Sequence, residues 1–193
     1  MSVSNYQLVS FCELALHKPT LYMWGTYGKP ITRSLLTSKA KQYPKNYSEA
    51  RKAYLTKHMD GKTLGCDCAG LIKWALWTDC DINKPPKYNS KTDRGSAGLY
   101  AAAKEKGKIS TMPETPGLIV YKSGHVGVYI GGGKVIECTL GKRGDGIVKT
   151  DLNAAGWTHW LKIPEVEYVP EKIKVYQKKT SIFDKLKWWR RDI

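Results

Sequence analysis

The stretch TLGCDCAGLIKWAL, residues 63–76, determines how the rest of the chain is interpreted. It places Cys66 and Cys68 on either side of a single aspartate, directly before an apolar run. Leucine, isoleucine and alanine recur at helical spacing in that run, so we expect a helix over 68–78 that begins at the second cysteine. Two thiols at a helix entrance have three interpretations: a metal site, a buried core, or a nucleophile.

A metal site is the interpretation that fits the spacing least well. A structural zinc ion needs about four ligands, which commonly come from two paired units. Only one residue separates Cys66 from Cys68, and the histidines at 17, 58, 125 and 159 form no second pair. We therefore expect no metal ion and no other cofactor, while burial in the core stays open for Cys66.

Cys68 has the features of a nucleophile. The first residue of a helix lies among unpaired N–H groups and at the positive end of the helix dipole, which lowers the pKa of a thiol. The same N–H groups could hold a developing oxyanion. The neighbouring Asp67 would act in the opposite direction, because a nearby negative charge raises the pKa of a thiol.

A nucleophilic cysteine needs an imidazole that accepts its proton and later donates it to the leaving amine. His125 suits this role, because it begins a predicted strand and its ring can point from the sheet edge towards a helix on that face. Glu137 follows on the returning strand, twelve residues later. An even offset across a hairpin can put both side chains on one face, where a carboxylate would orient the imidazole. The alternatives are a structural histidine and a surface glutamate.

The composition is that of one globular domain with an appendage. The 193 residues are 41% hydrophobic and 25% charged, and no stretch approaches the roughly 20 apolar residues that span a bilayer. The N-terminus lacks a basic segment followed by an apolar one, and the five cysteines have no regular spacing. We therefore expect free thiols and synthesis in the cytoplasm without a signal peptide.

A large positive charge is the strongest signal in the composition. Lysine and arginine total 32 against 17 acidic residues, a net charge of +15, which favours polyanionic partners such as nucleic acid, anionic lipid or bacterial wall polymers. Residues 26–65 contain nine of these cations and only two acids. This segment should contain a helix over 46–59. We expect it to be too polar to bury a core of its own, and therefore interpret it as a basic insert in the domain.

The remaining pattern predicts an α+β fold, with helices first and an antiparallel sheet after them. A capping box formed by Ser4 and Gln7 begins a helix over 5–17, in which Cys12 faces the core. A second short helix over 95–107 should end at its last glycine. About five strands follow, over 117–122, 125–131, 134–138, 146–150 and 158–163.

Two of these motifs together resemble those of the NlpC-type family of papain-like cysteine peptidases. That family begins its catalytic helix with D-C-S-G-L, and its H-V-G-I-Y-I-G strand is followed by a third polar residue twelve positions after the histidine. The chain has DCAGLI at 67–72 and HVGVYIG at 125–131. The resemblance implies a papain-like fold, with the catalytic helix packed on the sheet and Cys68, His125 and Glu137 as the catalytic residues.

The resemblance also implies contacts with a substrate. The family's Y-x-W-G run matches YMWG at 22–25, so Tyr22 is expected to help polarise the oxyanion and Trp24 to lie alongside it. Asp67 would contact the amino group of the substrate. The chain departs from the family in having Ala69 where a serine is usual, in lacking the acid of a frequent G-D-L-V run, and in using a glutamate as the third residue.

The function implied by the resemblance is hydrolysis of amide bonds in the stem peptides of bacterial peptidoglycan, after release or export to the wall. An amidase that separates the sugar from the first L-alanine would need the same three residues. Outside the enzymes, the alternative is a basic protein that binds nucleic acid, which we do not expect because no RNA- or DNA-binding motif accompanies the basic segment.

Two regions follow from this interpretation. Residues 1–164 would form the hydrolase domain, with the basic insert at 26–65. Residues 165–193 would form a basic C-terminal extension. Its short amphipathic helix could dock on the domain or contact a membrane surface.

Overall fold

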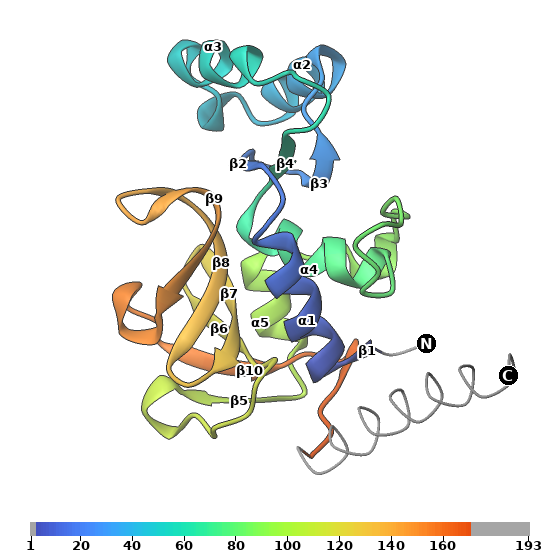
Figure 1. The fold of residues 1–193 in the computed structure, drawn as a ribbon. Helices are drawn as coiled ribbons and strands as arrows, with labels where there is room; N and C mark the ends of the chain where they lie inside the picture. Colours follow the sequence, from blue (N-terminus) through green and yellow to red (C-terminus); the bar gives the residue numbers. More distant parts are fainter. Residues whose placement is uncertain (1–2, 171–193) are drawn as a thin grey trace, which may run out of the picture.

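The computed structural model describes residues 3–170 of the chain (Figure 1). The α-helices are α1 Asn5–Ala15, α2 Arg33–Gln42, α3 Glu49–Lys57, α4 Cys68–Trp77 and α5 Ser96–Ala102. Short 3-10 helices are η1 Pro44–Asn46, η2 Ser90–Thr92, η3 Ile109–Thr111 and η4 Leu152–Ala154. The strands are β1 Val3–Ser4, β2 Thr20–Tyr22, β3 Tyr27–Pro30, β4 Leu64–Cys66, β5 Glu105–Lys108, β6 Ile119–Lys122, β7 His125–Gly131, β8 Lys134–Gly141, β9 Gly144–Asp151, β10 His159–Lys162 and β11 Val166–Glu167.

The central antiparallel sheet has the strand order β5-β10-β6-β7-β8-β9, and it contains all five predicted strands. Its additional strand, β5, corrects the prediction of one helix over 95–107. Helix α5 ends at Ala102, and residues 105–108 pair with β10 instead. Gly107 lies opposite Trp160, where a Cβ would come within 2.8 Å of the indole nitrogen. Pairing with the sheet edge has therefore outweighed the helical preference of an alanine-rich segment.

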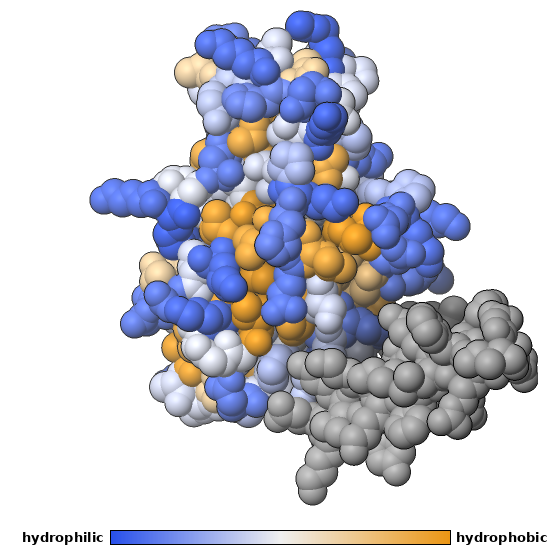
Figure 2. All heavy atoms as spheres, viewed as in Figure 1, coloured by the Kyte–Doolittle hydropathy of each residue, from blue (hydrophilic) through white to orange (hydrophobic). Residues whose placement is uncertain are grey.

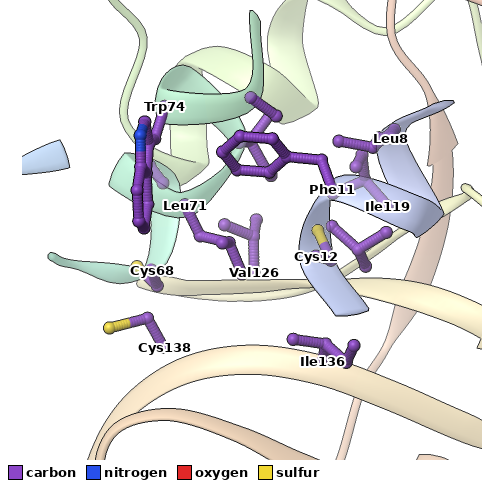
Figure 3. Packing of buried hydrophobic residues seen from close by; sticks show 14 of the residues in the cluster. Leu8, Phe11, Cys12, Cys68, Leu71, Trp74, Ile119, Val126, Ile136 and Cys138 are labelled. Atoms are coloured by element: carbon purple, nitrogen blue, oxygen red, sulfur yellow. The ribbon is translucent and has the colours of Figure 1, made fainter. Parts of the chain in front are cut away.

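Helices α1 and α4 cover one face of the sheet and form the main core with it (Figure 1). The predicted capping box begins α1: Ser4 Oγ accepts a hydrogen bond from the Gln7 N–H at 3.2 Å, and Gln7 Oε1 accepts one from the Ser4 N–H at 2.8 Å. Cys12 is fully buried, as predicted, and Phe11 meets Trp74 edge-to-face with ring centroids 5.2 Å apart (Figure 3). Helix α4 in turn packs against β7 and β8.

The basic insert forms α2 and α3, and the small sheet β2-β4-β3 joins it to the domain (Figure 1). The helix predicted over 46–59 is α3, whereas α2 has no counterpart in the prediction. The apolar residues of the segment are buried together with residues outside it: Leu36 and Leu55 lie in one cluster with Leu21 and Met23. The latter two residues precede the segment, so the cluster anchors the insert to the domain. Its outer surface is predominantly hydrophilic (Figure 2).

The last described residues pack back onto the domain. Strand β11 pairs in parallel with β1, Val166 is buried in the main core, and the Tyr168 hydroxyl accepts a hydrogen bond from the Ile163 N–H at 3.2 Å. The predicted C-terminal amphipathic helix lies outside the described residues. Between residues 3 and 170, no helix combines the length and the apolar character needed to cross a membrane.

Candidate active site

The start of α4 is held by Asp67, its N-cap residue. One carboxylate oxygen accepts a hydrogen bond from the Gly70 N–H at 2.6 Å, and the other accepts one from the Gly25 N–H at 2.7 Å. Only glycine fits at position 70, because a Cβ there would lie 1.9 Å from the Thr26 carbonyl oxygen. The YMWG loop (22–25) is thereby attached to the entrance of the helix. The contact of Asp67 with a substrate amine stays a prediction.

Cys68 is the first residue of α4, and its Sγ lies 4.0 Å from the Gly124 carbonyl oxygen, directly before β7. Burial raises the pKa of the Cys68 thiol to about 12, the charge of Asp67 adds to this, and the N–H groups of Val126 and Ala69 oppose it. The expectation that the helix start lowers this pKa is therefore wrong in its net effect. Loss of hydration outweighs the hydrogen bonds, so the thiol is protonated at neutral pH and needs a base to react.

His125, the first residue of β7, is hydrogen-bonded to Glu137 of β8. Its Nε2 lies 2.5 Å from Glu137 Oε2, and the Glu137 side chain has no exposed surface. The two residues lie on one face of the hairpin, as their even offset predicted, because Glu137 pairs with Gly127, two residues beyond the histidine. The contact at Nε2 leaves the other ring nitrogen, Nδ1, for a second partner, and the exchange of a proton with Cys68 stays a prediction.

Glu137 has further partners that the sequence analysis missed. Oε1 accepts hydrogen bonds from Arg143 Nε at 3.0 Å and from Thr150 Oγ1 at 2.8 Å, and Oε2 accepts one from Arg143 Nη2 at 3.1 Å. Burial alone would raise the pKa of Glu137, but the hydrogen bonds from His125, Arg143 and Thr150 lower it to about 2. The residue beside the imidazole is therefore a carboxylate. No local pattern marks Arg143, which lies in the turn after β8.

The ring of Trp157 stacks on the imidazole of His125, with centroids 5.2 Å apart and an interplanar angle of 8°. Gly127 makes room for it, since a Cβ there would lie 3.3 Å from the Trp157 ring and 2.7 Å from the Val135 side chain. The stacking restricts the imidazole to the plane in which it meets Glu137. Trp157 directly precedes the strand predicted over 158–163, and no sequence signal connects it with the histidine.

The YMWG loop is held in place by residues of the insert. Arg51 of α3 donates hydrogen bonds to both oxygens of Asp145 at 2.5 and 2.8 Å, and another to the Tyr22 carbonyl oxygen. Asp145 also accepts the Tyr22 N–H at 2.8 Å, and the Tyr47 hydroxyl donates to the Trp24 carbonyl oxygen at 2.5 Å. Burial raises the pKa of the Tyr22 hydroxyl, which therefore stays protonated and can donate a hydrogen bond.

Two cavities meet at Trp24, which is 36% exposed and lines both. One, of about 490 Å³, contains Cys68, and the other, of about 280 Å³, contains His125 and three residues of the insert. The predicted residues that line one cavity or the other are Tyr22, Trp24, Asp67, Cys68 and His125. Glu137 lies behind the histidine. A larger cavity, of about 760 Å³, lies over η3 and η4 and contains none of the predicted residues.

The groups that meet at these two cavities are a thiol, an imidazole backed by a carboxylate, and the N–H donors of a helix start. Such a set can form a covalent bond to a carbonyl carbon, move one proton and stabilise an oxyanion. Within the described residues, no three His, Cys, Asp or Glu side chains are grouped as a metal site would require.

The sequence profile of the NlpC/P60 family matches residues 40–165, which is more than half of the chain. The chain belongs to the NlpC/P60 family. The region of this NlpC/P60 protein that the profile matches includes Cys68, His125 and Glu137, whereas Tyr22 and Trp24 precede it. No match was found among curated protein sequences.

Several solved structures are similar to this NlpC/P60 protein. The P60 domain of antigen MAP1204 from M. avium subspecies paratuberculosis has 16% identity and a TM-score of 0.47, with 85% of this chain and 98% of that chain covered. The peptidoglycan hydrolase RipB from Mycobacterium tuberculosis has 18% identity and a TM-score of 0.45, with 82% of this chain and 66% of that chain covered. The NlpC/p60 domain of the peptidoglycan hydrolase SagA has 14% identity and a TM-score of 0.44, with 83% of this chain and 100% of that chain covered. At these identities and TM-scores, the three structures give no basis for assigning a substrate.

Proposed function

We propose that this NlpC/P60 protein is a cysteine hydrolase that cleaves amide bonds in the stem peptides of bacterial peptidoglycan. Cys68 would be the nucleophile, His125 the general base and acid, and Glu137 the residue that orients the imidazole. The observation that carries the proposal is the 2.5 Å contact between His125 Nε2 and the buried Glu137 Oε2, with His125 lining a cavity that adjoins the one lined by Cys68. The enzyme would act on the wall after release or export from the cell that makes it.

In the acylation step, His125 takes the proton of Cys68 as the sulfur attacks the carbonyl carbon, because a thiol with a pKa of about 12 is not ionised beforehand. A carbon–sulfur bond forms, and the carbonyl oxygen becomes an oxyanion that the Cys68 N–H and the Tyr22 hydroxyl can stabilise. The carbon–nitrogen bond then breaks, and His125 gives its proton to the leaving amine. Water attacks the thioester with His125 as base, which releases a carboxylic acid and restores the thiol.

Two reactions share this chemistry, and the fragments that they release distinguish them. We favour cleavage within the stem peptide, because the motifs that carry the resemblance are those of the peptidases. An endopeptidase would leave the first L-alanine attached to the sugar, whereas an amidase would free the sugar from peptide. Mass spectrometry of purified wall after digestion separates the two, with Cys68→Ala as the inactive control. Digestion that is indifferent to iodoacetamide and to this substitution would contradict a cysteine hydrolase.

The basic insert would attract the enzyme to anionic wall polymers. Its positive charge flanks the cavity of His125, to which Asn46, Tyr47 and Arg51 contribute lining. The guanidinium of Arg51 is paired with Asp145, so the attraction must come from the exposed cations of the insert. Such an interaction between exposed charges weakens as salt rises through about 0.15 M, where the Debye length is about 8 Å.

Binding to purified walls across a salt series tests this role, with two variants of equal charge. The insert variant carries Gln in place of the exposed residues Arg33, Lys41, Lys45, Lys57 and Lys62. The control variant carries Gln in place of the exposed residues Lys84, Lys87, Lys91, Lys104 and Lys106, outside the insert. We expect the insert variant to bind less and to lose most of the salt dependence. An equal loss of wall binding in both variants would show that the net charge of the protein, and not the insert, attracts it to the wall.

A further inference from the structure

Arg143 contacts both oxygens of the Glu137 carboxylate. Its Nε donates to Oε1 at 3.0 Å, and its Nη2 donates to Oε2 at 3.1 Å and to Thr139 Oγ1 at 3.4 Å. The residue lies in the turn between β8 and β9, next to Gly144, whose φ of +141° is a conformation that glycine adopts readily. The hairpin turn thus folds the guanidinium back over the strand that carries Glu137.

Each carboxylate oxygen is shared between Arg143 and a second donor. Oε1 also accepts the Thr150 hydroxyl, and Oε2 also accepts His125 Nε2. The negative charge of the buried Glu137 is therefore compensated by the guanidinium whether the imidazole is neutral or protonated. A carboxylate whose only cationic partner was the imidazole would be compensated in one of these two states alone.

We propose that Arg143 is a positioning residue of the active site, which acts on His125 through Glu137. The bidentate contact fixes the carboxylate, so the imidazole keeps its orientation with Nδ1 available to Cys68. The guanidinium also shares the carboxylate's charge, so Glu137 stabilises the imidazolium of His125 less strongly. Because the imidazolium must give its Nδ1 proton to the leaving amine, this weaker stabilisation favours that step. The inference rests on the proposed function, in which His125 is the base and acid.

In the part of the chain that the structure describes, few charged groups face Glu137. His125 approaches from β7 and Arg143 from the turn, while β9 contributes only a threonine hydroxyl. Beyond the imidazole, Lys122 of β6 lies 6.0 Å from the centre of the Trp157 ring on which His125 is stacked. The ion pair between Arg51 of the insert and Asp145 of β9 has no net charge, so it adds little to the field at His125. Within residues 3–170, Arg143 is the one lysine or arginine in contact with the carboxylate, so removing its charge changes the field at His125 and no other such side chain replaces it.

The loss of this cation should move both limbs of the pH–rate profile to higher pH. The imidazolium of His125 is more stable without a neighbouring positive charge, so the neutral base forms only at higher pH, which raises the acid limb. The Cys68 thiolate is less stable without that charge, which raises the alkaline limb. The side chain of Arg143 is 27% exposed, so solvent screens part of the effect, and we expect a shift of about half to one pH unit.

Three variants test the inference: Arg143→Gln, Arg143→Lys, and Lys142→Gln as a control that removes an exposed charge from the same turn. The first readout is kcat/KM on purified wall as a function of pH. The second is the rate at which iodoacetamide alkylates Cys68, followed by mass spectrometry of its peptide, which needs no wall substrate. Arg143→Gln should lower kcat and shift both limbs. Arg143→Lys should leave the limbs in place and lower kcat less, and Lys142→Gln should change neither.

The inference is overturned if Arg143→Gln lowers kcat while both limbs stay in place, or if Lys142→Gln moves them equally far. Should Arg143→Gln fail to fold, Arg143→Lys still decides the matter, because one ammonium group cannot bridge both carboxylate oxygens and must reduce kcat. A shift in the alkylation profile of a protein that releases no wall fragments would reject the proposed function and keep the role of Arg143.

Discussion

Replacing Glu137 by glutamine should destabilise the fold by about 3 kcal/mol at neutral pH. The side chain has no exposed surface, and its hydrogen bonds lower the pKa of the carboxyl from its ordinary value of 4.5 to about 2. A difference of about two and a half pKa units corresponds to roughly 3 kcal/mol in favour of the ionised form. Glutamine resembles the neutral form in shape, so the substitution should lose about that amount.

Thermal and urea unfolding measure this loss. For a chain of this size, about 3 kcal/mol corresponds to a fall in Tm of roughly 6 to 12 °C. The matched control is Glu105→Gln, which removes a carboxylate that is 55% exposed and paired with Lys162 at the surface. Such exposed pairs contribute about 0 to 1 kcal/mol. The control should therefore lower Tm by a few degrees at most.

The loss should also depend on pH in one direction. The folded-state pKa of Glu137 is lower than the unfolded one, so its stabilisation is fully present above pH 4.5 and disappears as pH falls towards 2. The difference in free energy of unfolding between wild type and Glu137→Gln should shrink across this window. A difference that stays constant from pH 6 to 2.5, or a variant that unfolds within 1 °C of wild type, would refute the reasoning. The rate of wall digestion should fall clearly less in Glu137→Gln than in His125→Ala, because Glu137 only orients the base, whereas His125 is the base itself.

Three further results are expected. Cys68→Ala should abolish turnover, a loss of about two or more decades, while Cys66→Ala keeps most of it; an inactive Cys66 variant in wall digestion would place the nucleophile elsewhere. Arg51→Gln should raise KM for wall fragments and have little effect on Tm, because it frees the YMWG loop, whose Tyr22 N–H is held by Asp145. Asp145→Asn should have the same effect. An unchanged KM in both variants would show that the Arg51–Asp145 pair does not position this loop for the substrate. Gly127→Ala should lower Tm by several degrees and reduce activity, since the new methyl group lies 2.7 Å from the nearest side-chain carbon, and calorimetry showing wild-type stability would contradict this packing.

Local patterns were sufficient to place several elements of this protein. The capping box at Ser4 predicted the start of α1, because N-cap side chains act on N–H groups only a few residues away, and the spacing of apolar residues after Cys68 predicted α4. The hydrogen bond between His125 and Glu137 was also predictable. In a hairpin with a short turn, the alternation of side chains decides which residues share a face.

Only the tertiary structure decided how these elements act on one another. Arg143 reaches Glu137, and Trp157 reaches His125, through contacts that depend on the path of the chain and not on a periodic pattern. The same holds for the strand at 105–108, where hydrogen bonds from a distant strand overrode a helical sequence. The pKa of Cys68 shows the difference most clearly. The helix start predicted a lower pKa, but burial by residues far away in the chain raises it. Desolvation depends on the packed environment of the thiol and not on the local sequence.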